Sequence, residues 1–233
     1  IRDAAQARWG WHWENQETPQ RPVGITPLYS KVKLWCVPNV ESVRPVGPPA
    51  PNSPDFQTAA NELNDVLDNL TNDQRKIANF WSDGLGTYTP PGHWNRFACE
   101  SIVKNRYNPL RAARVLAYLN MAMQDAGIAC WDAKYYFHYP RPIQAMPGFK
   151  TILGTPNFPS YTSGHSMFSA AGAEVLSYIF PADAATFQNY SEEAALSRLY
   201  GGIHYRFDIT DGNTSGKAVG QYTIDRMKVD GGE

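Results

Sequence analysis

Lys134 and Arg141 stand seven residues apart in an otherwise aromatic stretch that covers residues 131–142. Pro140 and Pro142 must end any helix there. We therefore expect Lys134 in the last regular turn of a helix and Arg141 beyond the break. A pair of this kind, taken alone, is more often two surface cations whose aliphatic stems pack on apolar surface.

A second polar segment covers residues 158–166, where Pro159 and small polar residues lead into a helix predicted to begin near Ser163. The free N–H groups and the dipole of a helix N-terminus attract anions. Gly164 allows close approach of the backbone, and His165 is placed to exchange a proton with a bound anion. Ser163 by itself is equally typical of an ordinary helix cap.

The third segment, residues 197–208, contains Arg198, His204 and Asp208. Arg198 and His204 would lie about 240° apart on an unbroken helix. Gly201 and Gly202 allow a turn that brings both side chains to one point. Asp208 can then accept a hydrogen bond from the second ring nitrogen of His204, which fixes the tautomer and raises its basicity.

Together the three segments predict a pocket with net positive charge and many hydrogen-bond donors. Such a pocket suits a tetrahedral or trigonal-bipyramidal oxyanion, with one histidine on its axis and the other as acid and base.

The order and spacing of these residues resemble a known signature. K-x6-R-P begins at Lys134, S-G-H covers residues 163–165, and S-R-x5-H-x3-D covers residues 197–208. This pattern is similar to that of the type 2 phosphatidic acid phosphatase and vanadium haloperoxidase superfamily. The resemblance implies an all-α helical bundle.

Further details resemble the haloperoxidases, in particular bacterial haloperoxidase-like proteins, over residues 80–208. Trp131 matches a tryptophan that lines their vanadate pocket, and Phe158 opens their extended F-P-S-Y motif. Asp83, in the segment 80–91, matches an aspartate that pairs with the arginine corresponding to Arg198. Thr162 departs from the pattern, because proline usually precedes S-G-H. The N-terminal helical bundle of these enzymes has no room in this chain, so it has been removed, is supplied by another chain or never existed.

The resemblance implies vanadate as cofactor, with phosphate as a surrogate, and hydrogen peroxide, a halide and a small organic acceptor as reaction partners. Halide would be oxidised to hypohalous acid, with vanadium remaining V(V). His204 would coordinate vanadium, His165 would move protons, and Lys134 would also polarise the bound peroxide. The residues that would hold the vanadate oxygens are Lys134, Arg141, Ser163, Gly164, His165 and Arg198, supported by Asp83, Trp131, Phe158 and Asp208.

Two other functions use the same residues. In a soluble acid phosphatase, His204 would attack a phosphomonoester and form a phosphohistidine, and His165 would protonate the leaving alcohol. In a non-enzymatic oxyanion-binding protein the pocket would be a relic. The remaining histidines, His12, His93 and His138, match no motif position and are expected to be structural.

Helical periodicity and caps predict an all-α core that positions these segments. Residues 1–54 are expected to be an irregular arm and connector rich in Pro and Trp, with residues 4–13 extended, and residues 55–233 form the helical domain. Nine of the 18 prolines lie in that first part. The predicted helices cover residues 56–70, 72–82, 109–123, 163–180, 182–200 and 214–227.

Composition excludes several classes of function. The 233 residues include 21 Lys and Arg against 22 Asp and Glu, so no basic excess favours nucleic acid or a membrane surface. No apolar run approaches the roughly 20 residues that span a bilayer, so we expect a soluble chain and no membrane lipid phosphatase. Cys36, Cys99 and Cys130 show no disulfide or zinc spacing. Because the chain begins at Ile1 without a signal pattern, we expect a processed or truncated form, secreted or periplasmic by family resemblance.

Overall fold

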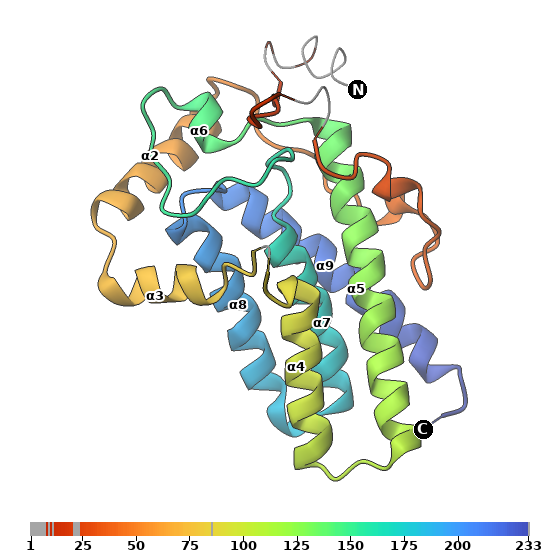
Figure 1. Ribbon diagram of the computed structural model, residues 1–233. Helices are drawn as coiled ribbons and strands as arrows, with labels where there is room; N and C mark the ends of the chain where they lie inside the picture. The colour runs from red at the N-terminus through yellow and green to blue at the C-terminus, as the bar shows by residue number, and fades with distance from the viewer. Residues whose placement is uncertain (1–7, 9, 11, 21–23, 85, 233) are drawn as a thin grey trace.

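The structure is a computed structural model that describes residues 8, 10, 12–20, 24–84 and 86–232 (Figure 1). Within these ranges the regular secondary structure is helical throughout, which confirms the all-α prediction. No described helix combines the length and the apolar character needed to cross a bilayer. The three cysteines are free.

A central helix, α7, organises the bundle, because it packs against α4, α5, α8 and α9 (Figure 1). To one side, α3 packs against α8, and α2 touches both α8 and α9. The helices in chain order are α2 (Pro54–Asp68), α3 (Asn72–Phe80), α4 (Thr89–Lys104), α5 (Pro109–Phe137), α6 (Pro142–Ala145), α7 (Gly164–Ile179), α8 (Ala184–Tyr200) and α9 (Arg206–Lys228), with short 3-10 turns η1 (Tyr29–Lys31), η2 (Val40–Ser42) and η3 (Pro181–Asp183).

Side-chain caps begin several helices where the sequence predicts them. Thr71 and Gln74 form a complete capping box at the start of α3. Asn108 accepts a hydrogen bond from the backbone N–H of Arg111 and starts α5, and Ser163 does the same for Ser166 at the start of α7. These polar contacts confirm the predicted starts of three helices.

Helices α4, α6 and α9 differ from the prediction. No helix was predicted at α4 or at the short α6, and α4 contains Pro90 and Pro91 in its first turn. Prolines at the first helical positions are tolerated, since those N–H groups have no helical partner. The last helix was predicted from Thr214 and begins instead at Arg206, with Gly212 inside it.

Glycines in α9 permit close packing on α7. A Cβ atom at Gly212 would lie 2.9 Å from the carbonyl oxygen of Ser163, and one at Gly216 would collide with the carbonyl oxygen of Met167. At Gly220 it would approach the side chain of Glu174 to 2.6 Å. The two backbones therefore lie side by side, and the backbone N–H of Ser163 donates to the carbonyl of Asp208 at 2.9 Å.

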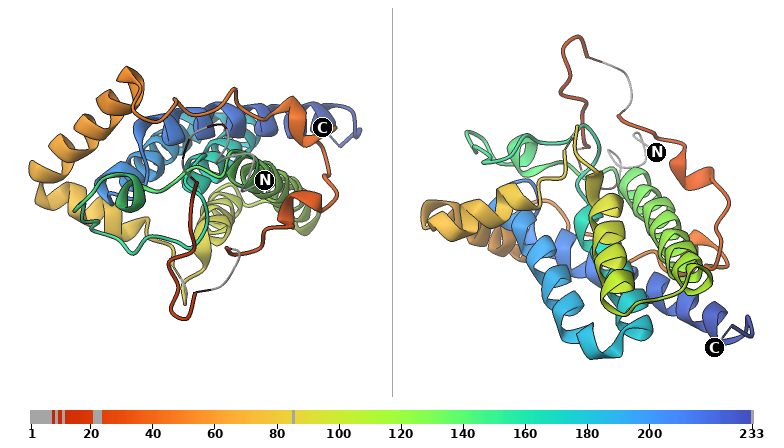
Figure 2. Two further views of the ribbon diagram at one scale, coloured as in Figure 1. Left: turned by 90° about the horizontal axis from the view of Figure 1, so that it is seen from above. Right: turned by 60° about the horizontal axis from the view of Figure 1, so that its bottom comes forward.

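Residues 24–53 form an irregular arm that passes along the outside of α5 before the chain enters α2 (Figure 2). The buried carboxylate of Asp125 on α5 accepts hydrogen bonds from the backbone N–H groups of Trp35, Cys36 and Val37 at 2.8, 2.8 and 3.0 Å. Val37 is part of the core between α5, α7 and α9. Most of the predicted extended segment 4–13 lies outside the described residues.

Candidate anion-binding site

The predicted site residues meet where the C-terminal ends of α5 and α8 approach the N-terminal ends of α7 and α9, in the upper part of Figure 1. Lys134 lies in the last turn of α5 and Arg198 in the last turn of α8. His165 lies in the first turn of α7, and His204 precedes α9. Arg141 follows the break after α5, as predicted, at the start of α6.

His204 is oriented by the carboxylate of Asp208, whose Oδ2 lies 2.7 Å from Nδ1 of the imidazole. Because a carboxylate accepts, Nδ1 carries the proton and Nε2 keeps its lone pair. Burial lowers the pKa of His204 well below its usual value, and the nearby Arg141 and Lys134 lower it further. His204 is therefore a neutral imidazole whose Nε2 can act as a ligand or a nucleophile.

Asp208 has two more partners that hold its carboxylate in place. The hydroxyl of Ser160 donates to Oδ2 at 2.6 Å, and the backbone N–H of Tyr205 donates at 3.2 Å. Burial raises the pKa of Asp208 to about 6, while the Ser160 hydrogen bond and the charges of Lys134 and Arg141 limit that rise. Ser160 lies within the second polar segment but was not among the predicted site residues.

Arg141 is fully buried and incompletely satisfied. Nε donates to the carbonyl of Phe158 at 3.0 Å, and Nη1 contacts the carbonyl of Ile203 at 2.7 Å and Nε2 of His204 at 2.9 Å. Nη2 is buried without a hydrogen-bond partner. Burial lowers the pKa of Arg141 to about 10. A buried charged donor without an acceptor is costly, so this atom is a candidate contact for an anionic ligand.

Lys134 is equally buried, but backbone carbonyls already surround it. Its Nζ donates to the carbonyl oxygens of Pro159 at 2.9 Å, Ser160 at 2.9 Å and Thr162 at 2.5 Å. Burial lowers the pKa of Lys134 to about 7. Its charge lies within the site, whereas its three N–H groups hold the loop that leads into α7.

The ring of Phe158 lies close to both cations. Nζ of Lys134 is 4.9 Å from the ring centroid, and Cζ of Arg141 is 5.1 Å from it. The face of an aromatic ring attracts cations, so Phe158 supports both without neutralising either. Trp131 packs against Phe158, with ring centroids 5.0 Å apart, and its Nε1 donates to the carbonyl of Ile25 in the arm at 3.1 Å.

Arg198 is oriented by backbone carbonyls, and the predicted pairing with Asp83 is wrong. Its Nη2 donates to the carbonyls of Ala78 at 3.2 Å and Trp81 at 2.6 Å. Asp83 makes no ion pair with Arg198, although the structure describes both residues. The last carbonyls of α3 have no helical partners and satisfy the guanidinium instead. Burial lowers the pKa of Arg198 to about 9, and the charge of Asp83 opposes that shift.

Asp83 is buried beside the site, between two histidines. Its Oδ2 lies 3.2 Å from Nδ1 of His93 and 3.9 Å from Nε2 of His165. Burial lowers the pKa of His165 well below its usual value, and Arg198 adds to this. Nothing in the spacing of the sequence points to the contact between His93 and Asp83, because it depends on the unpredicted helix α4.

Several features of the site suit an oxyanion. Among the described residues, the buried atoms Nη2 of Arg141 and Nε2 of His165 have no hydrogen-bond partner. A Cβ atom at Gly164 would meet nothing nearer than the sulfur of Cys130 at 3.8 Å, so the packing of the chain does not itself require glycine there. Positive charges and the N-terminus of α7 surround these groups. The donor set therefore fits a tetrahedral oxyanion such as vanadate or phosphate.

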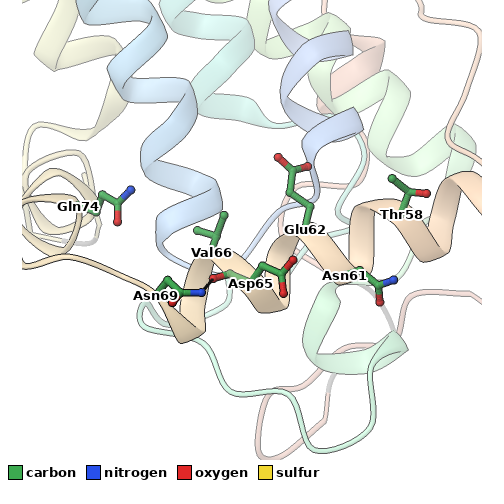
Figure 3. A pocket seen from close by; sticks show the side chains of 7 residues that line it. All are labelled: Thr58, Asn61, Glu62, Asp65, Val66, Asn69 and Gln74. Carbon is green, nitrogen blue, oxygen red and sulfur yellow. Dashed lines mark hydrogen bonds between the residues drawn. The ribbon is translucent and has the colours of Figure 1, made fainter.

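A hollow on the surface lies elsewhere, beside α2 and the first turn of α3 (Figure 3). It contains none of the predicted site residues. No described group of three or more His, Cys, Asp and Glu side chains is arranged to hold a free metal ion.

Comparisons with known proteins give a consistent result. Residues 114–226 match the family model described as the PAP2 superfamily. The vanadium chloroperoxidase of Curvularia inaequalis is 28% identical over a match that covers 36% of this chain and 18% of that protein.

Among solved structures, the first bacterial vanadium-dependent iodoperoxidase is 29% identical, with a TM-score of 0.83 over 92% of this chain and 60% of the other. A holo-type bacterial vanadium-dependent chloroperoxidase shares the fold at 16% identity, with a TM-score of 0.75 over 88% of this chain and 55% of the other. The chain thus spans less than two thirds of the length of these relatives.

Proposed function

We propose, from the premise that residues 114–226 form a PAP2 superfamily domain, that this chain is a vanadate-dependent haloperoxidase. It would use hydrogen peroxide to oxidise a halide to hypohalous acid, which then reacts with a small organic acceptor. The observation that carries the proposal is the similarity to the bacterial iodoperoxidase, which extends over 92% of this chain at 29% identity. The buried cationic site agrees with it.

The residues of the site would hold vanadate mainly by charge and by directed donors. Nη2 of Arg141 and the start of α7 at Ser163 and Gly164 offer hydrogen bonds. Lys134 and Arg198 contribute positive charge from buried positions. Electrostatic interactions are strong in such a preorganised, water-poor site. When bound, vanadate would supply a Lewis-acidic V(V) centre that activates hydrogen peroxide without a change in oxidation state.

The two histidines have different environments and therefore different roles. His204 keeps the lone pair on Nε2 because Asp208 holds the proton on Nδ1, which is the tautomer that a metal-ligating imidazole needs. In this structure the lone pair faces Nη1 of Arg141 at 2.9 Å, a contact that vanadium would replace. His165 has a buried Nε2 without a hydrogen-bond partner. It can accept a proton there and return it, as a general acid and base does.

A phosphatase remains the second candidate, because the contact between His204 and Asp208 also suits a nucleophile. Nε2 of His204 would attack the phosphorus atom of a phosphomonoester, and His165 would protonate the leaving alcohol. Both reactions require the same anion site, so geometry alone does not separate them.

Two assays on the same preparation test the proposal. Halogenation of an activated diketone with peroxide and halide should require vanadate, and millimolar phosphate should inhibit it competitively against vanadate. Hydrolysis of a chromogenic phosphate ester should be negligible. Hydrolysis without halogenation would identify the phosphatase instead.

Two variants then test the roles of the histidines. His204→Ala should lose vanadate affinity in equilibrium dialysis while the helical circular dichroism persists. His165→Ala should keep the anion but lose most turnover. Equal loss of vanadate in both variants would contradict the division of roles.

A further inference from the structure

His93 reaches the edge of the proposed site from α4, a helix that contributes no residue to the motifs. Its Nδ1 lies 3.2 Å from Oδ2 of Asp83. The same carboxylate oxygen lies 3.9 Å from Nε2 of His165. Asp83 therefore has a histidine on either side, one at hydrogen-bond distance and one beyond it.

Packing holds His93 in this position. Its side chain is 1% exposed and is surrounded by four aromatic rings, with centroid distances of 5.0 Å to Phe80, 4.5 Å to Trp81, 5.1 Å to Tyr88 and 4.9 Å to Phe97. A ring enclosed in this way cannot follow Asp83 if the carboxylate moves. The position of His93 thus determines the position of the carboxylate.

The contact also determines the tautomer of His93. A carboxylate accepts, so Nδ1 carries the proton. Nε2 of His93 is then a buried nitrogen without a hydrogen-bond partner. A buried nitrogen without a partner lowers stability. If His93 only filled the aromatic core, phenylalanine would fill the same space without that penalty, because it has no polar atom.

We propose that His93 is a positioning residue: its Nδ1–H holds the Asp83 carboxylate beyond hydrogen-bond distance of His165, so that Nε2 of His165 has no hydrogen-bond partner among the described residues. The inference rests on the proposed function, because His165 is the acid and base there. If Asp83 were released, the donor nearest to it after His93 would be His165. Pairing with Asp83 would occupy Nε2 of His165, the atom that must exchange protons.

The groups around His165 come from every element of the site. They are Asp83 after α3, His93 on α4, Lys134 on α5, Arg198 on α8 and His204 before α9. Among these groups and the other described residues, Asp83 is the single carboxylate within ion-pair distance of His165. The backbone of Trp81 also forms a hydrogen bond with the His165 ring, so the position of Asp83 concerns Nε2 of His165, the nitrogen without a hydrogen-bond partner among the described residues.

The test compares two amides of similar size and polarity. In His93→Asn the side-chain N–H group is attached to Cγ, as Nδ1 is, and can still donate to Asp83. In His93→Gln the N–H group is one bond further out, at the place of Nε2. The 15N NMR signal of His165 Nε2, assigned by its loss in His165→Gln, is recorded at one pH without added anion. Wild type and His93→Asn should show an unpaired, unprotonated nitrogen, and His93→Gln a nitrogen that is paired or protonated.

Kinetics of the vanadate-loaded protein provide the second readout. We expect kcat to fall about tenfold in His93→Gln, which is the lower end of the effect of losing a supporting hydrogen bond. In His93→Asn kcat should stay within about twofold of wild type, because the hydrogen bond to Asp83 is kept. Vanadate affinity should change less than kcat in both variants. If halogenation is absent throughout, the NMR result still decides the role of His93, and only the proposed function fails.

Two results would overturn the inference. An unchanged His165 signal in His93→Gln would show that His93 does not restrain Asp83. The same altered signal in His93→Asn and His93→Gln would show that His93 acts by packing. If His93→Gln does not fold, His93→Phe replaces it. The double variant with Asp83→Asn should restore the wild-type signal, since the effect requires the carboxylate.

Discussion

At the scale of single residues, Lys134 shows how burial can make anion binding depend on pH. Burial lowers its pKa to about 7, compared with an ordinary value of about 10.4. A bound anion favours the charged form, so the free protein must take up a proton at Lys134 when it binds an anion above that pH. Affinity is therefore full below pH 7 and decreases as the pH rises through 7.

Sulfate is a suitable probe, because its own charge is constant in this range. We expect its dissociation constant, measured by calorimetry, to increase by up to about tenfold between pH 7 and 8, which is the limit for one linked proton. In Lys134→Met the affinity should be weaker at pH 6 and nearly independent of pH. A wild-type pH dependence that persists in Lys134→Met would assign the proton to another group.

At the scale of helices, the contact between α7 and α9 brings the two halves of the site together. Gly216 lies where an added Cβ would collide with the backbone carbonyl of Met167. A rigid carbonyl cannot move aside as a flexible side chain can. We expect Gly216→Ala to lower the free energy of unfolding by about 1–3 kcal/mol, as overpacking does, despite the helix propensity of alanine, about 1 kcal/mol more favourable.

Gly154 provides the control, because a Cβ there would meet nothing within 4 Å. Urea denaturation of Gly154→Ala should match wild type to within about 0.5 kcal/mol. Gly216→Ala should also weaken oxyanion binding, since separating the helices moves Ser163 away from Asp208. A stable Gly216→Ala with unchanged affinity would contradict the importance of this close approach.

The elements differ in how far the sequence could predict them. Local caps determine the starts of α3, α5 and α7, so Thr71, Asn108 and Ser163 were sufficient. The early start of α9 depends on its neighbour, because Gly212 weakens an isolated helix and becomes favourable only against α7. The contact of Asp83 with His93 depends on α4, which was not predicted, so the sequence could not reveal it. The pairing of His204 with Asp208 was predictable because both lie within one turn.

At the scale of the whole molecule, a fully buried carboxylate is one of the groups that join the arm to the bundle, besides the ion pair between Arg44 and Asp132. Asp125 is 0% exposed and accepts three backbone hydrogen bonds from Trp35, Cys36 and Val37. In Asp125→Asn an amide N–H group would face these donors. We expect the free energy of unfolding to fall by about 1–3 kcal/mol, the cost of unsatisfied buried groups.

Limited proteolysis should show where this effect occurs. Cleavage within residues 24–53 should be faster in Asp125→Asn than in wild type, while α7 and α9 remain intact. Asp225→Asn is the control, because Asp225 interacts only with exposed neighbours among the described residues, Gln221 and Lys228. Equal cleavage rates in the two variants would show that the carboxylate does not hold the arm.

The glycines of α9 have one more consequence, which concerns the alignment of the helices along their axes. Gly212, Gly216 and Gly220 recur every four residues, so a slide of α9 by one such step, about 6 Å, would still place two glycines against α7. Apolar packing alone thus accepts more than one alignment. Polar contacts near the N-terminal ends of α7 and α9 exclude the shifted alignments. The Ser163 N–H donates to the Asp208 carbonyl, the Ser160 hydroxyl to the Asp208 carboxylate, and Arg141 to the Ile203 carbonyl. Ser163 and Arg141, which would hold the oxyanion, therefore also help to set the register of the bundle.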